Sequence, residues 1–123
     1  MRVVLADCQG KVRSALRLLL EQECEACVAV EADDAGSLLL AVQDFAPDLL
    51  LMDWHLPGQP PEELLAALRA ECPGAFIAVL SGRPEVCDVA LAAGANAFVC
   101  KGDPPEMLLD VLAQARAASP HCK

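Results

Sequence analysis

The chain has 123 residues, of which 55% are hydrophobic, and a net charge of −9 at pH 7. This length favours one domain whose core needs neither a disulfide nor a metal, and no apolar run approaches the ~20 residues of a membrane span. The acidic charge argues against direct nucleic-acid binding by this domain, because phosphate contacts require a basic face.

The first third of the chain alternates between strand-like and helix-like patterns. Residues 2–7 form a short β-branched run, residues 11–23 carry apolar side chains at helical spacing, and residues 27–32 again resemble a strand. Either Asp33 or Asp34 can then cap a second helix. The predicted inward face of that helix consists of Ala35, Leu38, Leu39 and Val42.

The next segment carries the candidate reacting group. Four apolar residues at 49–52 are too few for a helix and are typical of a strand buried on both faces. Pro57 and Gly58 end this strand within a few residues. A hydrophobic core explains the apolar residues but does not require Asp53 at the end of the strand. Because ligands bind beyond the carboxyl ends of the strands in open α/β sheets, Asp53 is the candidate.

The alternation continues through the middle of the chain. The proline pair at 60–61 suits the first turn of a third helix. Residues 75–80 predict a fourth strand that leads into Ser81, and Pro84 opens a fourth helix that ends at Gly94. The predicted inward faces of these two helices consist of Leu64, Leu65 and Leu68, and of Val86, Val89, Ala90 and Ala93.

The last strand and helix complete the pattern. Residues 96–100 predict a fifth strand, which leads into Lys101. Asp103 and Glu106 have the spacing of an acidic capping box for the final helix. The predicted inward face of that helix consists of Met107, Leu108, Val111, Leu112 and Ala115.

Strand and helix therefore alternate five times with short connections. This alternation predicts an α/β fold, a doubly wound parallel sheet with helices on both faces and strand order 2-1-3-4-5. We expect residues 1–118 to form this single domain, and residues 119–123 to be a C-terminal tail or the start of a linker.

Polar side chains follow four of the predicted strands, namely Asp7, Asp53, Ser81 and Lys101. Parallel strands place their C-terminal ends on one edge of a sheet, so we expect these residues to converge. Two carboxylates, a hydroxyl and an ammonium group suit the transfer of a phosphoryl group to a carboxylate. Asp53 would be the nucleophile, and a divalent cation held by acids would offset the phosphoryl charge. Ser81 and Lys101 would bind phosphoryl oxygens.

The seven cysteines would suggest disulfides in a small secreted chain. However, Asp7, Lys11 and Arg13 interrupt any signal-peptide h-region, so we expect a cytoplasmic protein with reduced thiols. Cys24 and Cys27 have the C-x-x-C spacing of redox and zinc sites. A redox pair would follow a strand and open a helix, whereas this pair lies where a predicted helix is followed by a strand. A zinc site would need two more ligands, and the sequence has no second cysteine pair of this spacing. We therefore expect these thiols to act as small hydrophobes.

The chain also resembles a known family across essentially its whole length. The matching segments are Val3-Val-Leu-Ala-Asp7, Leu51-Met-Asp53-Trp-His-Leu-Pro57-Gly58, Ala78-Val-Leu-Ser81-Gly82 and Ala92-Ala-Gly94-Ala-Asn-Ala-Phe98-Val-Cys-Lys101. They are similar to the receiver domains of bacterial two-component response regulators. The last segment, together with residues 102–109, is most similar to receivers that precede a LuxR-type helix-turn-helix domain. The resemblance implies the flavodoxin-like (CheY-like) fold.

The resemblance also implies a phosphorelay function in signal transduction and not an enzyme. Asp53 would accept a phosphoryl group from a phosphohistidine of a sensor histidine kinase or a phosphotransfer protein. Ser81 and Lys101 would stabilise the phosphorylated state, and Phe98 would turn inward as Ser81 moves toward the phosphoryl group. The residues that would tune dephosphorylation are His55 and Arg83. The expected partners are the kinase, a second copy of the chain and, in a longer chain, a DNA-binding output domain for transcription regulation.

The expected cofactor is Mg²⁺, bound weakly. The family has two adjacent acids after the first strand, whereas here Asp7 is followed by Cys8. A thiol is a poor ligand for this hard ion. By resemblance, Mg²⁺ would keep only Asp53, the backbone carbonyl of His55, and Asp7.

Other functions are compatible with this fold. A pseudo-receiver, meaning a binding module that works without phosphorylation, is the main alternative because of Cys8. Phosphatases with a nucleophilic Asp usually carry a second Asp two residues later, where this chain has His55. A flavodoxin-like electron carrier would need a loop rich in Ser, Thr or Gly after the first strand, which residues 7–10 do not supply.

Overall fold

The computed structural model describes residues 1–24 and 27–118, so the predicted tail at 119–123 lies outside the described residues. The strands are β1 (Arg2–Ala6), β2 (Val28–Ala32), β3 (Leu49–Asp53), β4 (Phe76–Ser81) and β5 (Ala97–Cys100). The helices are α1 (Gly10–Glu23), α2 (Ala35–Phe45), α3 (Pro61–Glu71), α4 (Val86–Ala92) and α5 (Pro105–Ala118).

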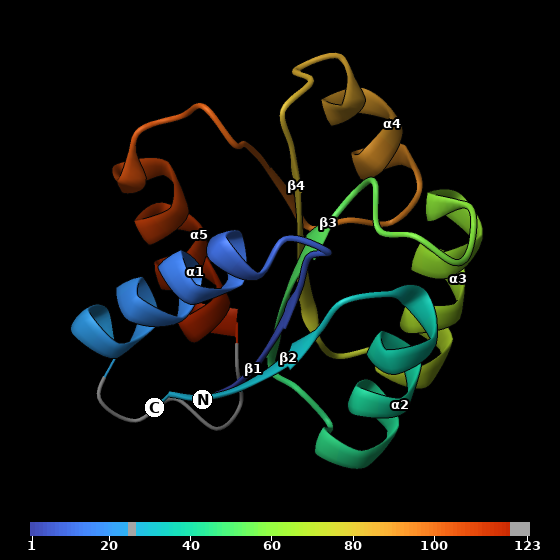
Figure 1. Cartoon of the computed structure of the whole chain (residues 1–123), viewed down its shortest axis with the longest axis horizontal. Coiled ribbons are helices and arrows are strands. Elements are labelled where there is room, and N and C mark those ends of the chain that lie inside the picture. Colours follow the sequence, from blue (N-terminus) through green and yellow to red (C-terminus); the bar gives the residue numbers. More distant parts are fainter. Residues whose placement is uncertain (25–26, 119–123) are drawn as a thin grey trace.

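The strands form one parallel sheet in the order β2-β1-β3-β4-β5, which confirms the predicted topology. Figure 1 shows α1 and α5 on one face of the sheet and α2, α3 and α4 on the other. This two-sided cover follows from right-handed crossovers between parallel strands. The strand order makes β3 the central strand. Because helices cover both faces of the sheet, all five residues of β3 are buried.

Side chains of β3 alternate between two hydrophobic clusters. Leu50 and Met52 belong to the larger cluster with the inner residues of α2, α3 and α4. Leu49 and Leu51 belong to the second cluster, with α1 and α5. The short apolar run is therefore a strand covered on both sides, as its composition predicts.

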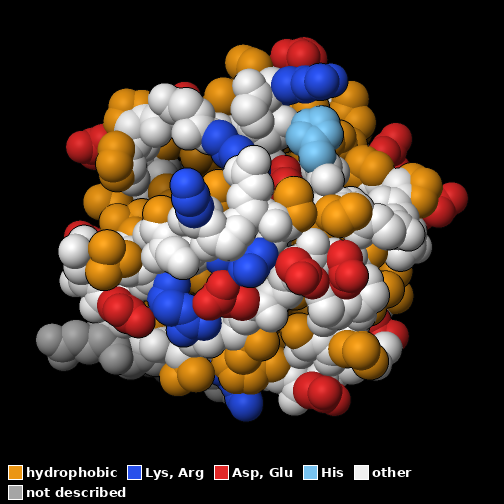
Figure 2. All heavy atoms as spheres, viewed as in Figure 1, with side chains coloured by type: hydrophobic (Ala, Val, Ile, Leu, Met, Phe, Trp, Pro, Cys, Tyr) orange, Lys and Arg blue, Asp and Glu red, His pale blue; other side chains and the backbone are white. Residues whose placement is uncertain are grey.

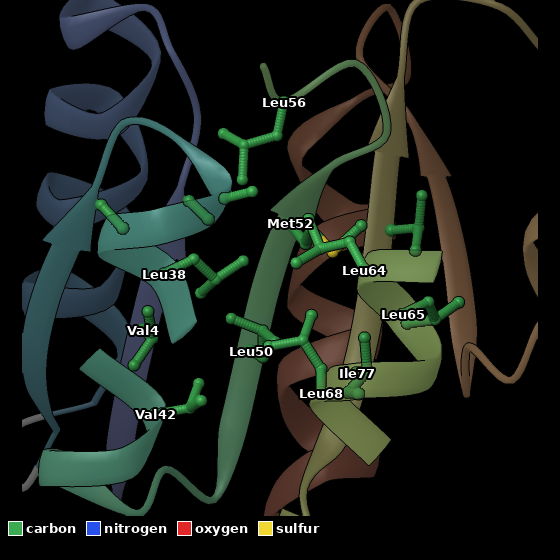
Figure 3. Close-up of a cluster of buried hydrophobic side chains, with 14 of the residues drawn as sticks. Val4, Leu38, Val42, Leu50, Met52, Leu56, Leu64, Leu65, Leu68 and Ile77 are labelled. Carbon is green, nitrogen blue, oxygen red and sulfur yellow. The ribbon is translucent and has the colours of Figure 1, made fainter. Parts of the chain in front are cut away.

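In the larger cluster, side chains of α2 and α3 pack against the same face of β3 (Figure 3). Leu38 of α2 and Leu64 of α3 both point toward the strand from their helices, and each is fully buried. The Pro61 start of α3 and the Asp34 cap of α2 match the predicted positions. Both helices thus begin beside the C-terminal edge of the sheet, where the candidate site was predicted.

Three predicted details of the helices are wrong. Val89 of α4 and Met107 of α5 were expected to face inward, but they are 47% and 46% exposed. The α4 helix has only seven residues, and of its predicted inward residues only Val86 and Ala90 are buried. The Asp103 carboxylate does not form the predicted capping box. It accepts a hydrogen bond from the backbone N–H of Cys100, because α5 begins only at Pro105.

The expectation of reduced thiols is also wrong for one pair, since Cys24 and Cys27 form a disulfide. Helix α1 ends at Glu23, and the N–H of Cys27 donates to the carbonyl of Cys24. The two Cα atoms lie 5.4 Å apart, inside the usual range for a disulfide. The free cysteines of the described residues are Cys8, Cys72, Cys87 and Cys100.

The described helices include none that is long and apolar enough to cross a membrane. On the face drawn in Figure 2, acidic side chains are intermixed with the basic ones, which do not gather into one patch.

We predict that Leu50→Ala lowers the free energy of unfolding by about 2–5 kcal/mol, because it removes a fully buried side chain from the central strand. Denaturant unfolding followed by circular dichroism measures this loss. The matched control is Leu40→Ala on α2, a leucine that is 63% exposed, for which we expect a change within about 0.5 kcal/mol. Equal losses in the two variants would contradict the placement of β3.

Candidate functional site

Two buried carboxylates lie side by side at the C-terminal edge of the sheet. Asp7 follows β1 and Asp53 is the last residue of the adjacent β3, and they are only 2% and 4% exposed. The Asp7 Oδ1 atom accepts the N–H of Gln9 at 2.9 Å, and Asp53 Oδ1 accepts the N–H of His55 at 3.1 Å. Each carboxylate is therefore oriented by the loop that follows its own strand.

Lys101, which directly follows β5, compensates the charge of both acids. Its Nζ atom lies 2.7 Å from Asp7 Oδ2 and 3.4 Å from Asp53 Oδ1. Its backbone N–H donates to the carbonyl of Ser81 at the end of β4, which fixes where the side chain begins. Burial lowers the pKa of Lys101, but the hydrogen bond to Asp7 and the charge of Asp53 outweigh it, so the pKa is raised. The lysine is charged at neutral pH.

Ser81 lies at the same edge, but within the described residues its hydroxyl makes no hydrogen bond to either acid. The side chain is fully buried, and its Oγ atom accepts the backbone N–H of Arg83 at 3.1 Å. The Oγ atom also lies 3.2 Å from Nε2 of His55. Since the Arg83 amide is already a donor, the hydroxyl hydrogen can be given to the imidazole nitrogen. Ser81 is thus hydrogen-bonded away from Asp53.

The other predicted site residues lie around these four. His55 and Arg83 are exposed, on the loops after β3 and β4. Phe98 of β5 is partly buried and packs against the larger hydrophobic cluster.

Asp7, Cys8 and Asp53 are the group of described residues that could hold a metal ion. One ligand atom from each lies within 4.8 Å of the others, and the Cys8 thiol is exposed whereas the acids are buried. In the part of the chain that the structure describes, no hydrogen bond reaches the second oxygen of Asp53, Oδ2. No buried side-chain oxygen of the described residues lacks a hydrogen-bond partner, so this oxygen is reached by solvent and is accessible to a cation. The set does not fit Mg²⁺ well, because this ion prefers oxygen ligands and the third donor is sulfur.

Arg13 is a residue of the site that the sequence analysis missed. Its guanidinium donates to the backbone carbonyl of Asp7 and also pairs with Glu31 of β2, 2.9 Å away. Arg17 pairs with the other oxygen of Glu31, and the two arginines lower the pKa of that carboxyl. The spacing of Arg13 and Arg17 by one helical turn was the available signal for a shared partner.

The sequence is similar to known response regulators. The family model described as "Response regulator receiver domain" matches residues 3–113. The nitrate/nitrite response regulator protein NarL of Escherichia coli (strain K12) is 31% identical over 117 residues, which cover 94% of this chain and 54% of that protein. The chemotaxis protein CheY of Halobacterium salinarum is 27% identical, with 95% of this chain and 98% of that protein covered.

A solved structure has the same fold. The CheY-like response regulator receiver domain protein from Methanospirillum hungatei JF-1 superposes with a TM-score of 0.83 at 25% identity. The match covers 95% of this chain and 94% of that one. By contrast, the chain spans about half the length of the first curated relatives that it matches.

We predict that Lys101→Met lowers the free energy of unfolding at pH 7 by about 1–3 kcal/mol, because two buried carboxylates lose their counter-charge. The raised pKa of Lys101 sets the pH dependence. Its contribution is fully present below the ordinary lysine value of 10.5 and is lost as the pH rises through the higher folded-state value.

The control is Lys11→Met, at an exposed lysine that makes no ion pair within the described residues. Urea unfolding at pH 7 compares the two variants. If both lysines contribute equally, the charge compensation described above is wrong.

Proposed function

The chain belongs to the response regulator receiver family, and from this membership we propose that Asp53 is the residue that accepts the phosphoryl group. A phosphoacceptor role in signalling is the function of this family. The observation that carries the assignment is the Asp53 carboxylate itself. It is buried at the end of the central strand, it lies 3.4 Å from an ammonium group, and one of its oxygens accepts no hydrogen bond from the described residues.

The proposed reaction needs little rearrangement. An oxygen of Asp53 attacks phosphorus, and the bond from phosphorus to the donor's nitrogen or oxygen breaks. Lys101 is close enough to pair with a phosphoryl oxygen, which spreads the new negative charge. Ser81 can donate to another phosphoryl oxygen only after its hydroxyl leaves His55. Phe98 then occupies the space that Ser81 vacates.

The proposed phosphoryl donor is a phosphohistidine of a sensor histidine kinase or of a phosphotransfer protein. We further propose that the face made by α4, β5 and α5 transmits the change to a second copy or to an output domain. Val89 and Met107 are exposed apolar residues on the two helices of this face. Relatives such as the DNA-binding response regulator MtrA suggest an output domain that binds DNA, in a longer protein. The pseudo-receiver alternative is not favoured by the family match.

Mg²⁺ is the cofactor implied by the family, whose members generally bind it at an acidic pocket. We propose that this chain binds it weakly through Asp7, Asp53 and the backbone carbonyl of His55. The reason is the thiol of Cys8, which replaces a hard oxygen donor.

We predict that acetyl phosphate with excess Mg²⁺ adds one phosphoryl group to the natural protein, and that Asp53→Asn abolishes this addition. Intact-protein mass spectrometry measures it directly. The matched control is Asp44→Asn at an exposed acid of α2, which should be modified like the natural protein. Phosphorylation that persists in Asp53→Asn would rule out Asp53 as the acceptor.

With beryllofluoride, NMR shifts near Ser81, Phe98 and Lys101 should appear in the natural protein and not in Asp53→Asn.

We also predict that Arg83→Ala accelerates dephosphorylation, by about tenfold at most, or ~1.4 kcal/mol of activation free energy. The substitution keeps the backbone N–H that binds Ser81 and removes only the guanidinium, which could shield the acyl phosphate from water. The decay of the phosphorylated species after removal of acetyl phosphate gives the rate. Arg116→Ala, at the far end of α5, should leave the rate unchanged. Slower decay in Arg83→Ala would show that Arg83 does not shield the phosphoryl group.

A further inference from the structure

In the ligand set Asp7, Cys8 and Asp53, one of the three donor atoms is sulfur instead of oxygen. Two of its donors are buried carboxylates, held in place by the Gln9 and His55 amides. The third is the thiol of Cys8, which is exposed. All three ligand atoms already lie within 4.8 Å of one another. The arrangement needs only a small closure to surround a cation.

The chemistry of the donors decides which cation fits. Mg²⁺ demands oxygen ligands in near-octahedral geometry and keeps several waters. Zinc accepts sulfur and carboxylate oxygen together, at about 2.3 Å and 2.0–2.2 Å. Zinc sites that act on a substrate combine three protein ligands with one open position. Three donors from Asp7, Cys8 and Asp53 match that number.

We propose that this cluster is a site for a thiophilic divalent cation of the zinc class, and that Cys8 selects such an ion over Mg²⁺. The thiol gives its proton to solvent as it binds, so the bound site carries a thiolate and two carboxylates. The cation would occupy the space among the three ligand atoms, where Oδ2 of Asp53 is open to solvent. This inference goes beyond phosphorylation and does not require Asp53 to be phosphorylated.

Lys101 is a competitor for the same carboxylates. Its ammonium lies 2.7 Å from Asp7 and 3.4 Å from Asp53, so a bound cation must share these oxygens with it or displace it. Removal of the ammonium should therefore tighten metal binding. In a site built only for charge compensation by lysine, the Cys8 thiol would have no effect on metal affinity.

The experiment is a titration of the full chain with Co²⁺, a spectroscopic substitute for Zn²⁺, in the absence of any phosphoryl donor. We expect one Co²⁺ per chain with a thiolate-to-metal charge-transfer band. Zn²⁺ should displace the Co²⁺, whereas a large excess of Mg²⁺ should not. Cys8→Ser should abolish the band and weaken binding by at least ~10–100-fold. Lys101→Met should strengthen binding.

The matched control is Cys87→Ser, because Cys87 is another free cysteine, located on α4, and its loss should leave the band intact. Cys8→Asp should reverse the preference, with no band and with tighter Mg²⁺ binding detected by the fluorescence of the buried Trp54. A band that persists in Cys8→Ser, or displacement of Co²⁺ by the large excess of Mg²⁺, would overturn the proposal. Because no phosphoryl donor is present, either result leaves the assignment of Asp53 as acceptor untouched.

Discussion

The site depends on the ion pairs that Lys101 makes with Asp7 and Asp53. Two carboxylates buried within one cleft repel each other and lose their hydration, and one ammonium offsets much of that cost. The fold makes this arrangement possible, because β1, β3 and β5 all end at the same edge of the sheet. The same ammonium that stabilises the resting protein is available to a phosphoryl group on Asp53. Stability and the proposed reaction therefore draw on one interaction.

The second feature of the resting site is the hydrogen bond between Ser81 and His55. Because the hydroxyl is bound to the imidazole and to the Arg83 amide, it must exchange partners before it can reach a phosphoryl oxygen. The phosphoryl group must therefore bind the Ser81 hydroxyl more favourably than His55 does. A ligand shifts an equilibrium between two states only by the difference between its affinities for them. His55 thus connects the loop after β3 to the end of β4.

Cys8 is the point where this chain departs from the chemistry of its family. The residue occupies the loop between β1 and α1, which Arg13 anchors through the carbonyl of Asp7 and through Glu31. The loop is therefore held close to the acids even though its third donor is sulfur. The sulfur donor of Cys8 in place of a carboxylate oxygen changes which cation the site prefers, while the two carboxylates, the lysine and the fold stay the same.

The sequence by itself determined the topology, the buried central strand and the edge at which Asp7, Asp53, Ser81 and Lys101 lie. Apolar periodicity locates the strands and helices, and right-handed crossovers between parallel strands place the C-terminal ends of the strands on one edge. The tertiary structure alone decided the partners of the side chains. The bond from Ser81 to His55, the contact of Arg13 with Asp7, the position of Asp103 and the Cys24–Cys27 disulfide each depend on how loops and helix ends meet. Hydrogen bonds and disulfides form only when the two partner atoms lie within a few ångströms of each other. Apolar periodicity does not specify the distance between such atoms.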